Sequence, residues 1–150
     1  MDYAALHSEI VNAPASKGYA AFVSAGNDQG VADLLNAPNG SISRGVISKD
    51  LFVTLAMSPL SALYTLEKTD PTNALYVALY PMLKLLEQAS SIDTSLSPIQ
   101  NALAGCVAGG IMTDAEKANC LTRAGSRAEV LFGADAFVSG NDVARAQGRF

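Results

Sequence analysis

The chain contains one histidine, His7, and histidine is the side chain whose ordinary pKa lies closest to neutral pH. A serine triad built on His7 needs a nucleophile, but the sequence has no Gly-x-Ser-x-Gly elbow. Neither a Gly-x-x-x-x-Gly-Lys-Ser/Thr loop nor a Gly-x-Gly-x-x-Gly turn after a strand is present to hold phosphate. We therefore expect His7 to be a surface or partly buried side chain without a catalytic role, and we expect no cofactor and no metal site.

The carboxylates are scattered, and their closest pairs are Asp114 with Glu116 and Glu67 with Asp70. Both pairs fall near predicted helix ends, where capping and the helix dipole explain acidic residues. Glycosidic or other acid–base chemistry needs two carboxylates that face each other across a cleft. The sequence therefore predicts a protein that is not an enzyme and that has no small-molecule substrate.

The two cysteines, Cys106 and Cys120, offer a geometric hypothesis. If 98–110 and 114–124 form an antiparallel helical hairpin that turns near residue 113, the two thiols lie at the same height. A disulfide within the chain is one interpretation. Two small buried thiols in a reducing compartment, or a bond between neighbouring subunits, are the alternatives.

Composition narrows the classes of partner. The net charge of −4 lacks the basic excess of a nucleic-acid-binding protein. Charged residues make up only 16% of the chain, against about 25% in typical soluble domains, which favours burial of surface in an assembly. Asp2 and Glu9 stand where a signal peptide carries positive charge, and the uncharged runs 51–66 and 98–113 are shorter than the roughly 20 residues of a spanning helix. We expect no signal peptide, no transmembrane segment and no membrane partner.

The elements that position these residues are predicted to be helices almost throughout. Polar caps and proline in the first helical turn indicate helix starts at Asp2, Ser48, Ser58-Pro59, Asp70-Pro71 and Ser97-Pro98. Ala13-Pro14 is expected to end the first helix. Segment 39–48, which begins Asn39-Gly40, is either a small β-hairpin or a loop.

The helix that follows Pro71 has apolar residues around most of its circumference, so it is either central or in contact with a partner subunit. Pro81 is expected to kink or split it. Leu75, Leu79, Met82 and Leu86 form one apolar stripe, and Tyr76, Tyr80 and Leu83 form the next.

The last third of the chain contains clear signals for the start and the end of helices. Thr113 with Glu116 and Ser126 with Glu129 are spaced as capping boxes, and Gly133 is a plausible left-handed stop. Asn141 or Ser139 opens a last short helix. Without an internal repeat or a linker, the sequence predicts an all-α protein, a single helical domain over 1–150 with about six to eight short helices.

Two segments contain a recognisable series of motifs. Residues 2–38 contain a tyrosine–leucine helix, a break at Ala13-Pro14, Gly18-Tyr19-Ala20 and a helix that ends in Leu-Asn. Residues 126–147 contain a Ser-Arg-Ala-Glu helix, a glycine, a short loop, an Asp-Val pair and a final Ala-Arg. These segments resemble small proteins encoded by many tailed bacteriophages, which have Asp-Pro at the first break. The resemblance implies a phage gene product from a structural-gene neighbourhood and carries over no catalytic residue.

Low charge, the apolar central helix and this resemblance together favour a non-enzymatic virion structural protein. It would bind other phage proteins in the tail, baseplate or neck as a homo-oligomeric ring or in repeated copies. The alternatives are a cytosolic phage effector that binds and inhibits a host protein, and a head-completion adaptor. The expected interface residues are Tyr76, Tyr80, Leu83, Arg127, Glu129, Arg145 and Phe150.

Overall fold

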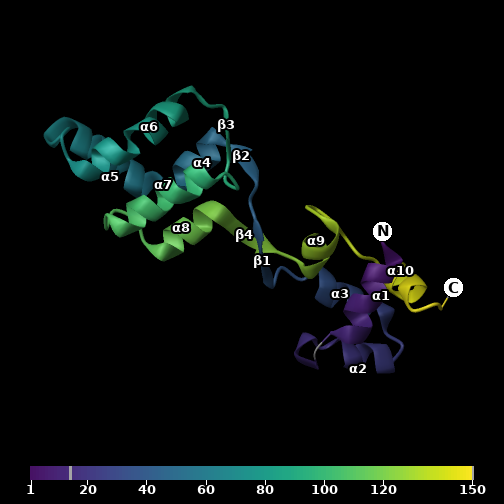
Figure 1. Ribbon diagram of the computed structural model, residues 1–150. Coiled ribbons are helices and arrows are strands. Elements are labelled where there is room, and N and C mark those ends of the chain that lie inside the picture. Colours follow the sequence, from purple (N-terminus) through teal and green to yellow (C-terminus); the bar gives the residue numbers. More distant parts are fainter. Residues whose placement is uncertain (14, 150) are drawn as a thin grey trace. The chain divides into compact units, whose positions relative to one another are not determined.

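The computed structural model describes residues 1–13 and 15–149, and these residues fold mainly into α-helices (Figure 1), as the sequence predicts. Where the sequence suggested one domain over 1–150, the chain divides into two compact units. The terminal unit contains Met1–Ile42 and Ala124–Phe150, and the central unit contains Ser43–Arg123. Each unit has its own cluster of buried hydrophobic side chains.

The terminal unit is assembled from both ends of the chain. Its core residues, such as Leu6, Leu35 and Val143, come from α1, α3 and α10, and α3 also packs against α2 and α9. The Asn36 side chain donates to the Val138 carbonyl at 2.7 Å and accepts from the Val138 N–H at 3.0 Å, which joins the early and late segments. Its elements are α1 (Tyr3–Asn12), η1 (Ala15–Lys17), α2 (Tyr19–Ser24), α3 (Asp28–Asn36), α9 (Arg127–Phe132) and α10 (Gly140–Ala146).

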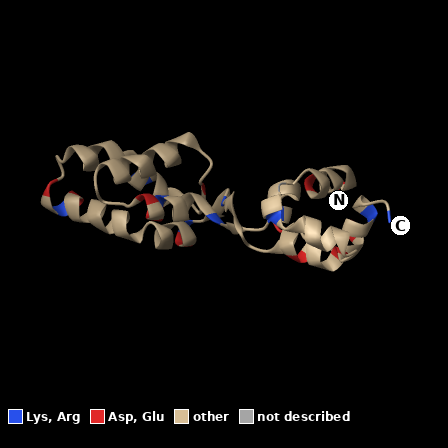
Figure 2. Cartoon of the chain, turned by 90° about the horizontal axis from the view of Figure 1, so that it is seen from below, with Lys and Arg blue, Asp and Glu red and all other residues tan. Residues whose placement is uncertain are grey.

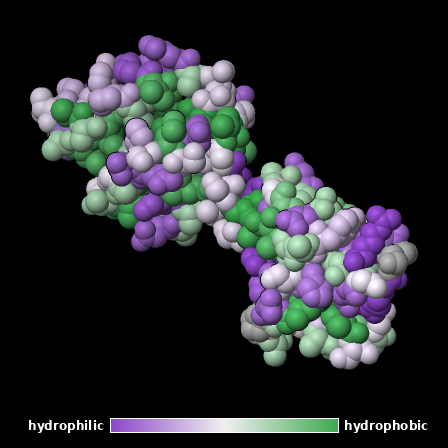
Figure 3. Space-filling model, turned by 45° about the vertical axis from the view of Figure 1, so that its right-hand side comes forward, coloured by the Kyte–Doolittle hydropathy of each residue, from purple (hydrophilic) through white to green (hydrophobic). Residues whose placement is uncertain are grey.

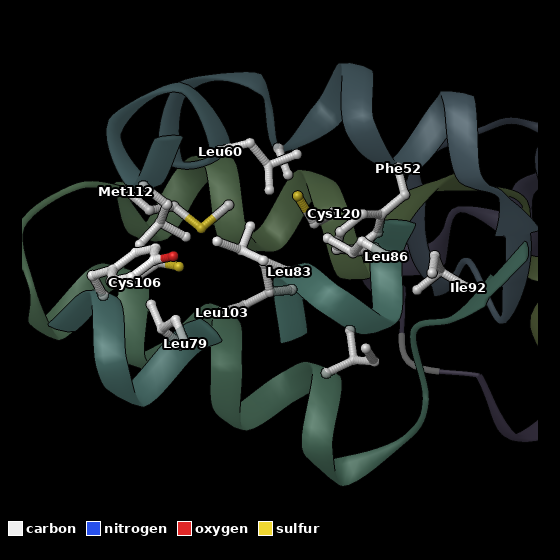
Figure 4. Close-up of a cluster of buried hydrophobic side chains, with 14 residues drawn as sticks. Phe52, Leu60, Leu79, Leu83, Leu86, Ile92, Leu103, Cys106, Met112 and Cys120 are labelled. Carbon is white, nitrogen blue, oxygen red and sulfur yellow. The ribbon is translucent and has the colours of Figure 1, made fainter. Parts of the chain in front are cut away.

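The central unit is a continuous segment of helices around a second core (Figure 4). Phe52, Leu63, Leu83 and Leu103 are its most deeply buried large side chains. Its helices are α4 (Lys49–Leu55), α5 (Met57–Thr69), α6 (Ala74–Gln88), α7 (Ser97–Ala108) and α8 (Asp114–Leu121).

Four short strands accompany the helices. β2 (Val46–Ser48) pairs antiparallel with β3 (Ser91–Asp93), with Ile47 opposite Ile92. β1 (Gly40–Ser43) pairs with β4 (Thr122–Gly125). A Cβ atom on Gly125 would lie 2.7 Å from the Ile42 side chain, so this close pairing requires glycine there.

Segment 39–48 therefore forms strands, but its two strands pair with distant partners and not with each other. Arg44 and Gly45, which lie between β1 and β2, do not form a hairpin turn because their backbone groups bond to distant segments of the chain. The Arg44 N–H donates to the Leu121 carbonyl at 2.9 Å, and the Gly45 carbonyl accepts from the Thr94 N–H at 2.9 Å.

Several helix starts follow the predicted caps. Asp2 accepts from the N–H groups of Ala4 and Ala5 at 3.0 Å, and Ser48 accepts from that of Leu51 at 3.2 Å. α1 ends before Ala13, whose backbone is extended, while Pro14 lies outside the described residues.

Two other predicted caps are wrong. α5 begins at Met57, one residue before Ser58, so that Ser58 and Pro59 lie inside its first turn. Asp70 ends α5, and Asn73 caps α6 by accepting from the Leu75 N–H at 3.0 Å. The Asp70 carboxylate accepts from the Thr72 hydroxyl at 2.9 Å, and this local bond occupies the group that was expected to cap α6.

The later helices need smaller adjustments. α7 begins at Ser97 with Pro98 in its first turn, and Leu96 takes the cap position. α6 continues through Pro81 as one helix and is not split there. Thr113, Ser126 and Ser139 each close a complete capping box. Gly133 ends α9 with a φ of 100°, a value that favours glycine.

Candidate interaction surfaces

His7 lies exposed on α1, and its Nδ1–H donates to the Ala146 carbonyl at 2.8 Å. The imidazole therefore binds the end of α10 in the terminal unit. Among residues 1–13 and 15–149, no cluster of three or more histidine, cysteine or acidic side chains is arranged to hold a metal ion.

The two acidic pairs have structural roles. Glu116 accepts from the Thr113 N–H at 2.7 Å and from the Thr113 hydroxyl at 2.8 Å, and these bonds lower the pKa of its carboxyl. Glu67 accepts from the Tyr76 hydroxyl at 3.1 Å, which joins α5 to α6. Glu116 therefore caps a helix, and Glu67 holds a helix pair together.

Cys106 and Cys120 are free, buried thiols in the central core, in place of the disulfide considered from their spacing. They do come from the packed helices α7 and α8, but Figure 4 draws their sulfur atoms apart, each among apolar side chains. Burial raises the pKa of both thiols, to about 11 for Cys120. Both sulfurs are thus held in their protonated, weakly reactive form.

For two residues of α6, the predicted role in an interface is wrong. Tyr76 is 6% exposed and Leu83 is 2% exposed, so both belong to the central core and are not available to a neighbouring molecule. Tyr80 is 41% exposed and remains at the surface. Its ring meets that of Tyr76 edge-on, with 5.7 Å between centroids, and the Lys84 ammonium lies 5.3 Å from its centroid.

The expected interface residues of the C-terminal segment also hold the fold together. Arg127 forms a two-pronged ion pair with Glu9, with its Nε at 2.8 Å and its Nη2 at 2.7 Å from the two carboxylate oxygens. Glu129 completes the Ser126 capping box. Hydrogen bonds from Ser139 are the main cause of the lowered pKa of Asp142, and the charge of Arg145, in the last turn of α10, lowers it further. Phe150 lies outside the described residues.

Charge is absent from two long stretches of the central unit. The sequence has no charged residue over 71–83 or over 94–113, which extends the run 98–113 by four residues toward the N-terminus, and these stretches include most of α6 and all of α7. Figure 2 draws residues other than Lys, Arg, Asp and Glu in tan, and long tan stretches of helix are visible in it; Figure 3 shows hydrophobic side chains at the molecular surface. An uncharged surface of this extent in an acidic protein is a candidate contact region.

The first candidate, which we call the uncharged groove, lies between α6 and α7 and has a volume of about 420 Å³. Among the described residues its lining contains no charged side chain, and Asn101 is its polar member. Leu85 on its wall is 55% exposed. The apolar and small lining residues include Pro81, Met82, Leu85, Pro98, Ala102 and Gly105.

The second candidate, which we call the lysine groove, lies against α4, α5 and the end of α6 and has a volume of about 530 Å³. Its apolar lining consists of Val53, Met57, Leu60, Tyr64 and Leu86. Its charged lining residues are Lys49, Lys68 and Glu87. Glu87 is already ion-paired with Lys84 at 2.9 Å, so the two lysines give the groove a positive balance.

The residues that form these grooves were not predicted from the sequence. Met57 and Leu85 are 61% and 55% exposed, but their apolar character favoured a place in the core. One signal could have identified the uncharged groove: two stretches without charged residues, 71–83 and 94–113, fall on helices that follow each other along the chain. No comparable signal exists for the lysine groove, whose walls come from three separate elements.

Comparisons of the chain with protein-family models, with curated proteins and with solved structures found no match. None of the helices in the described part of the chain combines the length and the apolar character that crossing a bilayer requires.

Proposed function

We propose that this chain is a non-enzymatic structural protein of a tailed-phage particle, and that its copies bind one another through the uncharged groove. The observation that carries the proposal is the lining of this groove, which contains no charged side chain among the described residues. The resemblance of 2–38 and 126–147 to tailed-phage proteins supplies the expected setting in the virion.

The charge distribution supports self-association at this place. Each copy carries a net charge of −4, so two copies repel each other when charged surfaces meet. Two copies that meet through the α6–α7 groove avoid this repulsion, because the described lining of the groove contains no charged side chain. The groove also offers both a hollow and a protruding side chain, Leu85, which a self-complementary contact requires.

The amino acids of the groove suit helix packing between subunits. Ala102 has a small side chain and Gly105 has none, so another backbone can approach α7 closely at these positions. Leu85 on α6 is 55% exposed, so contact with a second copy removes apolar surface from water. A stable interface buries at least about 1,200 Å² in total, which requires both helices of each copy to take part.

Self-association is tested with Leu85→Lys, measured by sedimentation equilibrium of the purified chain. We expect the variant to weaken association by more than about tenfold, because an ammonium group would be buried without a partner. Val130→Lys is the matched control, since Val130 is 48% exposed on α9 of the terminal unit and the charge change is identical. A wild-type chain that is monomeric at all accessible concentrations would remove the basis of the proposal.

The particle setting is tested by mass spectrometry of purified virions with internal standards for copy number. A fixed multiple that matches a symmetric ring supports a structural role, and the value separates a tail or baseplate ring from a head-completion adaptor. Absence from clean particles would contradict the virion assignment and favour the host-directed effector.

A further inference from the structure

We infer that the lysine groove binds an amphipathic helix of a different protein, a helix whose apolar stripe is flanked by acidic residues at both ends. This surface is separate from the uncharged groove and predicts a heterologous neighbour beyond the self-association proposed above. The exposed floor of the groove, its shape and its charged residues support this inference.

The floor of the groove is apolar and open to solvent. Met57 is 61% exposed and Tyr64 is 40% exposed, while Leu60 and Leu86 beneath them belong to the buried core. The exposed members share one face of α5, because residues 57, 61, 64 and 68 follow the spacing of successive helical turns. A ligand here therefore meets a stripe and not an enclosed chamber.

Two threonine hydroxyls of α5 that line the groove are already bonded within the helix. The Thr65 hydroxyl donates to the Ser61 carbonyl at 2.9 Å, and the Thr69 hydroxyl donates to the Thr65 carbonyl at 2.9 Å. Their methyl groups and the neighbouring apolar side chains are what remain for contact. Contact along the stripe is therefore mainly apolar, and Lys49 and Lys68 supply its positive charge.

The charges of the groove favour an acidic partner. Lys68 lies near the end of α5 and is exposed. Lys49 opens α4, and its ammonium donates to the Glu87 carbonyl at 3.1 Å, which leaves two of its three N–H groups for another acceptor. Because Glu87 is paired with Lys84, the groove presents positive charge on balance.

A helix fits these features better than a lipid chain does. From Met57 to Lys68 the stripe spans about 17 Å along α5, which about three turns of a partner helix would cover. A fatty-acid tail in so open a groove would leave one side in water, whereas an amphipathic helix turns its own polar face outward. Helix-in-groove recognition of this kind uses apolar anchors at three- and four-residue spacing.

The probe is a fluorescein-labelled synthetic helix of about fifteen residues, with leucine at three- and four-residue spacing and glutamate at both ends. Fluorescence anisotropy with the full chain measures its affinity. A matched peptide carries lysine at both ends. We expect the acidic peptide to bind more tightly than the basic peptide, and the difference to shrink at high salt.

Three variants test the site. Lys68→Glu is expected to lower the affinity for the acidic peptide about two- to fivefold, as the loss of an exposed ion pair does. The same variant should bind the basic peptide more tightly. Lys117→Glu on α8 is the control with the same change in net charge and should leave both affinities unchanged. Tyr64→Ala removes the aromatic anchor and should weaken both peptides by about fivefold or more.

Several outcomes would overturn the inference. One is equal binding of the two peptides, and another is an acidic-peptide affinity that neither Lys68→Glu nor Tyr64→Ala changes. Displacement of the peptide by oleate at submicellar concentration would assign the groove to an amphiphile. Loss of self-association in Tyr64→Ala would assign it to a second copy. Because sedimentation of Leu85→Lys tests the other groove, failure of one proposal is distinguishable from failure of the other.

Discussion

The ion pair between Arg127 and Glu9 joins segments that are 118 residues apart and gives a sharp test of how the terminal unit is held together. The Arg127 side chain is 31% exposed and that of Glu9 is 10% exposed. The Tyr19 hydroxyl also reaches Glu9, at 3.4 Å. Replacement of Arg127 by methionine keeps an unbranched apolar side chain but removes the guanidinium, so the Glu9 carboxylate is left with the Tyr19 hydroxyl as one weak neutral donor.

The expected cost follows from this geometry. Hydrogen bonds to charged groups contribute about 1.5–3 kcal/mol, and loss of one member of a buried pair costs about 3–5 kcal/mol. Water reaches part of Arg127, so we expect Arg127→Met to lower the free energy of unfolding by about 2–3 kcal/mol. Glu9→Gln should cost less, since water can serve the more exposed guanidinium, and the double variant should cost less than the sum of the two.

The pH dependence has a definite sign. Hydrogen bonding to Arg127 lowers the pKa of Glu9 in the folded chain, against an unfolded value of about 4.3. The pair therefore contributes its full stability above the unfolded pKa, and this contribution is lost as pH falls through the folded pKa. The difference between wild type and Arg127→Met should thus be largest near neutral pH and should shrink below about pH 4.

Urea denaturation followed by circular dichroism measures the free energy, and hydrogen exchange of α1 and α9 shows whether the loss is confined to the terminal unit. A cost of less than about 0.5 kcal/mol, the range of ordinary surface substitutions, would refute the reasoning. So would a difference that stays constant from neutral to acidic pH. Exchange that accelerates equally in α7 and α8 would show that the pair does not act locally.

Three further predictions concern the caps, the thiols and the central core. Ser126→Ala should lower the free energy of unfolding, measured by urea denaturation, by about 1–2 kcal/mol because Ser126 is buried. Thr113→Ala, at an exposed cap, should lower it by about half as much, and equal losses would contradict the role of burial. Cys106 and Cys120, whose pKa values are raised by burial, should react with a disulfide reagent at mild alkaline pH far more slowly in the native chain than in denaturant, and rapid native reaction would show that they are accessible. Leu63→Ala should cost about 2–5 kcal/mol, because Leu63 is fully buried, and a cost below about 1 kcal/mol would mean that the core around it collapses to fill the space.

The helix starts in the last third of the chain could be predicted from the sequence because each capping box is formed within four residues. The Thr113 and Ser126 boxes form as predicted. Prediction failed for the start of α6, where two polar side chains three residues apart competed for the cap. Asp70 bonds to Thr72, and Asn73 caps the helix.

The interface residues on α6 were harder to predict because apolar side chains surround the helix. Periodicity alone does not distinguish the face that meets α5 and α7 from the face that meets solvent. Tyr76 lies on the first and Tyr80 on the second, although both tyrosines belonged to the same predicted stripe. Where every face is apolar, the packing partners decide which one is buried.

The sequence by itself determined the helical class, most of the local caps and the uncharged character of α6 and α7, because these features depend on neighbours within about one or two helical turns. Only the tertiary structure decided the division into two units, since the chain passes between them within β1 and β4 and no linker composition signals the crossing. It also decided the strand pairs, the Glu9–Arg127 ion pair and the two grooves. Each of these joins residues far apart in the sequence, and their proximity follows from burial of two separate cores, which no local pattern encodes.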